Sequence, residues 1–170
     1  MGLPLLLALS MGATNCDDFE TVTVPATDTS PPNVFDGAYS GEYKTLVEAP
    51  GTETYHIPSG TDAFAVGSGV DPGGVSKVEL WPSLSFTCCS GHVCSGGTPD
   101  FPAPSIATQS GSVGSQVSDG VYTFILVEAP EASDYCGAGE TFSWDYSWHT
   151  EAWDFHGNHT TGITQHIVYP

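Results

Sequence analysis

The sequence predicts an all-β fold, and two observations carry this prediction. The apolar segments are short and are separated by turn-forming residues, with 20 glycines and 13 prolines among 170 residues. Glycine raises the entropic cost of a helix and proline removes a backbone donor, so this composition opposes long helices. No window of about 11 residues has the apolar spacing of an amphipathic helix. Short strands joined by turns indicate a β-sandwich rather than alternating strands and helices.

The expected strands follow from alternation and from the turn signals between them. Apolar and polar residues alternate clearly in 75–81 and 121–128, so successive side chains would point to opposite faces of a sheet. The dipeptides Gly73-Gly74, Asp119-Gly120 and Gly157-Asn158 mark turns. The predicted strands are 43–48, 62–67, 75–81, 84–88, 121–128, 141–146, 148–154 and 162–169.

The N-terminal part predicts export. Residues 3–9 are apolar but too few to span a bilayer as a helix, and small residues follow them, so 1–15 are interpreted as a signal peptide. Cys16 then stands where a bacterial lipoprotein signal places its lipidated cysteine. Secretion without a lipid, and an N-terminus that is not a signal, are the alternatives. The protein is expected in the bacterial cell envelope, at the outer membrane or in the periplasm, or secreted.

The remaining chain divides into a tether and a domain. Residues 16–38 are acidic, rich in Thr and Pro and without helical period, so we expect an extended tether. A first strand at Thr21–Val24 is the alternative. Residues 39–170 hold nearly all the predicted strands and are expected to form the domain.

Three segments carry a family resemblance. Residues 70–80 (VDPGGVSKVEL), 119–124 (DGVYTF) and 152–160 (AWDFHGNHT) occur in this order in the predicted domain. Together they resemble the bacterial immunoglobulin-like domain of an exported lipoprotein. The resemblance implies an immunoglobulin-like β-sandwich and a role as a surface or periplasmic interaction module.

Four cysteines in the domain predict two disulfides. An even number of cysteines in an exported chain is typical of a disulfide framework, and Cys88, Cys89, Cys94 and Cys136 remain once Cys16 is set aside. The adjacent Cys88 and Cys89 would point to opposite faces of a strand. Cys89–Cys94 with Cys88–Cys136 is therefore the favoured pairing, and the exchanged pairing stays open. A zinc or copper site that uses these thiols with His92 is the alternative.

Charge and missing motifs exclude several functions. The net charge is −18, from 2 Lys or Arg against 20 Asp or Glu, so the chain cannot neutralise nucleic acid phosphates or dock on anionic lipid. Membrane contact is expected only through the N-terminal lipid anchor. The sequence has no nucleophile-elbow, His-Glu-x-x-His or phosphate-loop motif. We expect no catalytic residue, no cofactor and no metal.

Aromatic residues supply the candidate ligand site. Trp144, Trp148 and Trp153 lie within ten residues, and Trp144, Tyr146 and Trp148 would share one face of a strand. An inward face would make them core residues, whereas an outward face would let a sugar ring stack on them. The predicted function is a non-catalytic exported interaction module with an unknown protein or glycan ligand. The alternatives are a carbohydrate-binding module, or a small metal-binding protein that uses His149, His156, His159 and His166.

Overall fold

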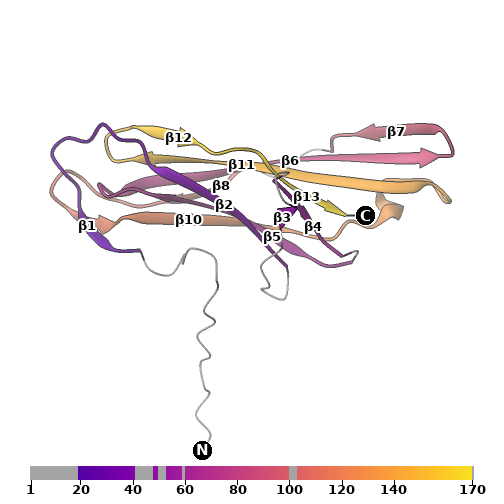
Figure 1. Ribbon diagram of the computed structural model, residues 1–170, viewed down its shortest axis with the longest axis horizontal. Helices are drawn as coiled ribbons and strands as arrows, with labels where there is room; N and C mark the ends of the chain where they lie inside the picture. The colour runs from indigo at the N-terminus through magenta and orange to yellow at the C-terminus, as the bar shows by residue number, and fades with distance from the viewer. Residues whose placement is uncertain (1–18, 41–47, 50–52, 59, 100–102, 170) are drawn as a thin grey trace, which may run out of the picture.

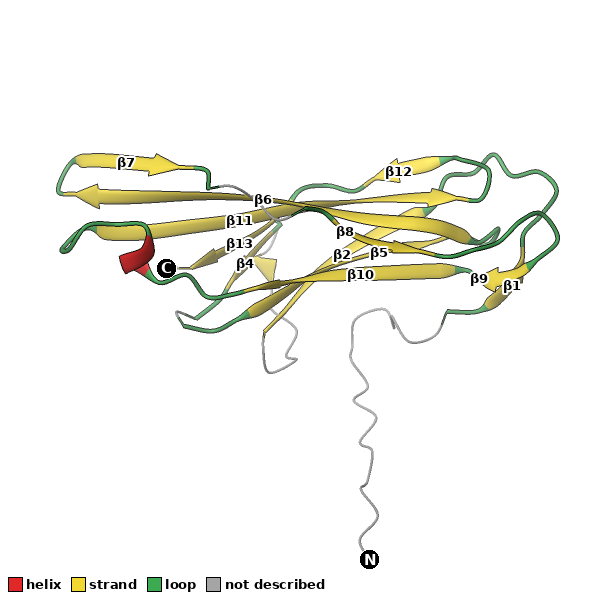
Figure 2. Cartoon of the chain, turned by 180° about the vertical axis from the view of Figure 1, so that it is seen from behind, coloured by secondary structure: helices red, strands yellow, loops and turns green. Residues whose placement is uncertain are grey.

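A computed structural model describes residues 19–40, 48–49, 53–58, 60–99 and 103–169. These residues form β-strands, with one 3₁₀ turn at Ala132–Asp134, and the strands pack as two facing layers (Figure 1). The predicted all-β sandwich is therefore confirmed. Seen from behind, the layer of β2, β5 and β10 lies below the layer of β6, β11 and β12 (Figure 2).

The smaller layer is a three-stranded antiparallel sheet in the order β10-β5-β2. Its strands are β2 (Asn33–Ser40), β5 (Ala63–Val70) and β10 (Gly120–Val127). Small residues occupy the inner positions of β5. A Cβ at Gly67 would lie 2.0 Å from the Thr150 hydroxyl oxygen, and one at Gly69 would lie 2.6 Å from the Ala152 Cβ. These glycines let the smaller layer approach the larger one closely.

The larger layer is built on β6 (Val75–Ser90) and β11 (Thr141–Asp154), which pair antiparallel along nearly their whole length. Both strands, with β7, extend past the smaller layer in Figure 1. The other strands of this eight-stranded sheet are β3 (Glu48–Ala49), β4 (Thr54–His56), β7 (Val93–Gly97), β8 (Ser105–Thr108), β12 (His159–Thr161) and β13 (Gln165–Tyr169). Separately, β1 (Thr21–Thr23) pairs with β9 (Gln116–Ser118).

Two predicted strand breaks were wrong. Residues 75–81 and 84–88 belong to one strand, β6, and residues 141–146 and 148–154 to another, β11. Pro82 does not interrupt β6. Pro82 lies opposite Trp148 of β11. On the other edge of β6, residues 77–80 pair with β8 and residues 86–90 pair with β7, so Pro82 falls in the unpaired gap between them. Proline is tolerated where a strand has no ladder partner to receive its missing N–H.

The predicted tether was wrong for residues 19–38. This segment contains β1 and most of β2, and Val24 and Pro32 are buried. The alternative of a first strand at Thr21–Val24 agrees with β1. The acidic and Thr-rich composition concealed these strands because few of their side chains face the interior. The predicted signal peptide, Cys16 and residues 43–47 lie outside the described residues.

Aromatic side chains fill much of the core between the layers. Trp148 and Ile167 are fully buried, and Tyr55, Tyr146 and Tyr169 pack in the same cluster. A second, smaller cluster consists of Val75, Val78 and Ala152. Large rings thus supply apolar burial in a chain with only 39% hydrophobic residues.

Candidate binding surface

The outer side of the smaller layer gathers large apolar side chains from all three of its strands. Because alternate residues of a strand point to opposite faces, the register fixes which of them are neighbours. The rows across β10, β5 and β2 are Tyr122–Ser68–Phe35, Phe124–Val66–Gly37 and Leu126–Phe64–Tyr39. We call the seven large residues of this grid the aromatic face: Phe35, Tyr39, Phe64, Val66, Tyr122, Phe124 and Leu126.

Much of the aromatic face is open to solvent. Phe35 is 46% exposed, Tyr122 49%, Phe124 53% and Leu126 47%. Phe64 packs edge-on against Phe124, with ring centroids 5.9 Å apart. Contiguous exposed apolar surface of this kind marks interaction sites on soluble proteins, whereas single exposed apolar residues are ordinary.

The aromatic face is also uncharged. None of the nine positions in its three rows is Asp, Glu, Lys or Arg, although the chain carries 20 carboxylates. Asp36 lies within β2 but points inward to Thr150 of β11. Acidic residues also stand at the strand ends: Asp62 and Asp119 precede β5 and β10, and Glu128 follows β10. The surface therefore has a neutral aromatic centre and an acidic border.

The proposed tryptophan platform was wrong for two of its three members. Trp144 and Trp148 are 5% and 0% exposed, because even-numbered positions of β11 face the smaller layer. Trp153 lies on the opposite side of β11. Its ring already contacts Lys77, whose Nζ is 3.6 Å from the ring centroid, and His159, which stacks at 5.8 Å. Ligand binding is thus not expected at these tryptophans.

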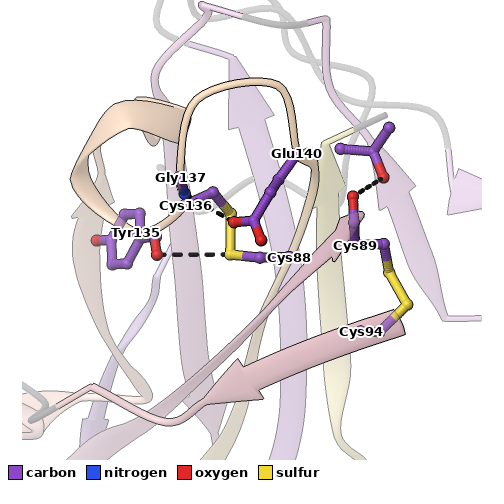
Figure 3. Close-up of a disulfide and its surroundings, with 8 residues drawn as sticks. Cys88, Cys89, Cys94, Tyr135, Cys136, Gly137 and Glu140 are labelled. Atoms are coloured by element: carbon purple, nitrogen blue, oxygen red, sulfur yellow. Dashed lines mark hydrogen bonds between the residues drawn. A yellow bond between two sulfur atoms is a disulfide. The ribbon is translucent and has the colours of Figure 1, made fainter. Parts of the chain in front are cut away.

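The cysteines form the favoured pairs. Cys88 bonds to Cys136 and Cys89 bonds to Cys94 (Figure 3). The sulfurs of Cys88 and Cys136 also lie within 4.8 Å of a Glu140 carboxylate oxygen. A disulfide offers no thiolate, however, and Glu140 accepts the Gly137 N–H at 2.7 Å. The thiol metal site is therefore not formed, and the loop before β11 is tied to β6.

The histidines near the C-terminus do not converge. His166 pairs with Asp145 at 3.0 Å, and His149 lies 3.8 Å from Glu151. Asp154 instead caps its own turn, because its carboxylate accepts the backbone N–H groups of residues 156 and 158, each at 2.8 Å. Among the described residues, the cysteine group above is the one set of three candidate ligands within 4.8 Å of one another.

Two carboxyl groups, those of Asp36 and Asp71, lie in surroundings that disfavour their ionised form. Burial raises the pKa of Asp36 to about 6, although hydrogen bonding to Thr150 and the nearby Trp148 indole lower it in part. Burial is also the main cause that raises the pKa of Asp71, and the Asp28 and Asp154 carboxylates add to it. Both groups therefore favour the protonated form more in the folded chain than in the unfolded one.

We expect mild acid and added salt to stabilise the fold. A folded pKa above the unfolded one contributes stability below the unfolded value, and this stability is lost as the pH rises through the folded value. For Asp36, lowering the pH from about 7 to about 5 should add about 1 kcal/mol to the free energy of unfolding. Salt should raise the melting temperature because it screens the net charge of −18.

Thermal melts of the native chain and of Asp36→Asn at several pH and salt values check this expectation. The variant should lose part of the pH dependence and keep the salt dependence. A melting temperature that falls between pH 7 and pH 5 would contradict the raised pKa values.

Comparisons with known proteins do not assign a family. No protein-family model matches the sequence, and a search of curated proteins finds no match. Within the described residues, no helix is long and apolar enough to cross a membrane.

Proposed function

We propose that this protein is a non-catalytic, exported binding module that docks a partner protein on the aromatic face. The observation that carries the proposal is the uncharged aromatic surface on a chain of net charge −18. Protein interfaces are enriched in aromatic residues and depleted of charged residues at their centre, and their rim is polar. The neutral centre and acidic border of this surface match that arrangement.

Charge favours a partner that carries an apolar patch with basic residues around it. Such a partner would be steered by the negative field of this chain and would pair with the acidic border. A second copy of the chain fits less well, because each copy carries −18 and long-range repulsion opposes their approach. The partner is therefore a different protein under this proposal.

The disulfides indicate an oxidising compartment outside the cytoplasm. We further propose that the fold is related to bacterial immunoglobulin-like domains and that Cys16 is lipidated, which would hold the module at the cell envelope. Mass spectrometry of the mature N-terminus tests the lipid attachment. An unmodified chain that begins at Met1 would contradict it.

Site-specific photo-crosslinking tests the docking surface. A benzophenone amino acid at position 124 should give discrete protein adducts in the cells that make this protein. Position 106 on β8 is the matched control, because Ile106 and Phe124 are both 53% exposed and Ile106 lies outside the aromatic face. Adducts from 106 and 124 alike, or from neither, would contradict the proposal.

A glycan ligand is the second candidate, supported by the aromatic rings exposed on one sheet face. Retention on insoluble cellulose, chitin or peptidoglycan tests this alternative. Retention of the native chain, lost in Phe124→Ser and kept in Ile106→Ser, would favour the glycan and contradict a protein partner.

A further inference from the structure

A groove of about 590 Å³ opens at the edge of the smaller layer, apart from the centre of the aromatic face. One wall is the segment 31–36, which enters β2, and the other is 160–163 with Gln165, which covers the end of β12 and the start of β13. This volume lies in the range of about 300–1,000 Å³ that small-ligand sites occupy.

Asp36 lines this groove, and protein donors satisfy its carboxylate only in part. The Thr150 hydroxyl donates to Oδ1. Among the described residues, Thr150 is the one side chain in full hydrogen-bond geometry with this carboxylate, the Trp148 indole lies near it, and Oδ2 lies beside Gly162. A Cβ at Gly162 would fall 2.7 Å from Oδ2 and 2.9 Å from Val34 Cγ1, so the glycine lets the chain pass this close to the carboxylate.

Gln165 lines the same groove and holds a buried acceptor beside it. Its side chain is 6% exposed, and its Oε1 is buried without any hydrogen-bond partner. Gln165 lies in register opposite Trp148 of β11, and the Trp148 indole N–H also has no partner in hydrogen-bond geometry. A buried polar atom without a partner costs about 1–3 kcal/mol. Such atoms in a native fold call for an outside partner or a function.

The chemistry of the groove selects its ligand. A desolvated carboxylate calls for a cation, and Gln165 Oε1 calls for a hydrogen-bond donor. Val34 and Ile163 line the same groove and would contact an apolar stem. The −18 charge of the chain further concentrates cations around it.

We propose that this groove binds an organic cation with N–H donors, an ammonium or guanidinium group on an apolar stem, against the Asp36 carboxylate and beside Gln165. Such a group occurs in small amines and in the Lys or Arg side chains of peptides. The second source has structural support, because β2 is an edge strand of its sheet and an extended peptide could pair with it.

Calorimetric titrations at about 0.15 M salt test the site, since this salt screens general attraction to the acidic chain. The probes are n-butylguanidinium and n-butylammonium, with n-pentanol as the neutral comparison. The cations should bind saturably and about 10- to 100-fold more tightly than the alcohol, as expected for a charged hydrogen bond. Equal affinities, or no saturable binding of either cation, would overturn the proposal.

Variants locate the binding. Asp36→Asn and Gly162→Ala should each weaken cation binding about tenfold or more, the first by removing the charge and the second because its Cβ would clash with Oδ2 and displace the carboxylate. Asp145→Asn is the control, because its carboxyl is 42% exposed on the other sheet and should leave the affinity unchanged. Circular dichroism melts confirm that each variant folds. Native affinity in both folded groove variants would overturn the proposal.

A final experiment distinguishes a free cation from a peptide side chain as the ligand. The capped tripeptide acetyl-Val-Arg-Val-amide is compared with n-butylguanidinium. Tighter binding of the peptide, lost in Asp36→Asn, supports a peptide side chain as the natural ligand, and equal binding supports a free cation. Tight peptide binding that is unchanged in Asp36→Asn would contradict the proposal that the cation binds at the Asp36 carboxylate.

Discussion

Replacing Cys88 and Cys136 together by alanine should lower the free energy of unfolding by about 4 kcal/mol. The two residues are 48 positions apart, so their bond removes much of the freedom of the unfolded chain. Cys88 is buried, and its Sγ lies 3.4 Å from the Tyr135 carbonyl oxygen. Tyr135 stacks on Phe142 of β11 at 5.7 Å. Loss of the bond therefore frees a segment that covers the extended end of the sheet.

The second disulfide is the matched control. Cys89 and Cys94 are 5 positions apart and already face each other across the β6–β7 hairpin. Their replacement by alanine should cost about 2 kcal/mol. Urea unfolding followed by circular dichroism measures both effects. Equal losses in the free energy of unfolding, or a larger loss from the hairpin pair, would contradict the conclusion that Cys88–Cys136 is the more stabilising disulfide.

Trp148→Ala should also destabilise the protein strongly, by about 3–5 kcal/mol. Trp148 is fully buried, and its ring stacks on Tyr55 at 6.0 Å and lies 6.2 Å from Tyr146. Truncation would leave a cavity in the main core that rigid neighbouring strands cannot fill. Urea unfolding by far-ultraviolet circular dichroism measures the loss without relying on tryptophan fluorescence.

Trp81→Ala provides the comparison for that variant. Trp81 is 39% exposed, and a surface substitution of this kind should change the free energy of unfolding by less than about 1 kcal/mol. Similar losses at positions 81 and 148 would show that Trp148 does not anchor the core.

The sequence predicted the fold class and the disulfides because both depend on local signals. Alternation in 121–128 and the Gly73-Gly74 turn are visible in a few neighbouring residues, and Gly74 indeed has a φ of 92°. The opposite directions of adjacent strand residues indicated that one of the two cysteines bonds to Cys94 and the other to Cys136, and the favoured assignment of Cys88 to Cys136 is confirmed. The strands at 19–38 were missed because their burial depends on β5 and β9, which lie far away in sequence.

The candidate site was not predictable in the same way. Shared spacing showed that Trp144 and Trp148 lie on one face, but only the packing of β5 against β11 shows that this face is inward. The alternation of Tyr122, Phe124 and Leu126 was equally visible and indicated a strand. These side chains form part of a surface patch only because the register of β5 and β2 places Phe64 and Phe35 on the same face. The aromatic face is thus a property of strand order, which no short motif encodes.

Hydroxyl-radical footprinting of the protein in its native envelope, compared with the purified chain, tests the central claim most directly. Oxidation of Phe35, Tyr122 and Phe124 should be high in the purified protein, where these side chains are about half exposed. In the envelope their oxidation should fall several-fold, because a docked partner excludes water from the centre of an interface. Ile106 should be oxidised equally in both samples. Equal oxidation of the aromatic face in both would contradict the claim that it is a docking surface.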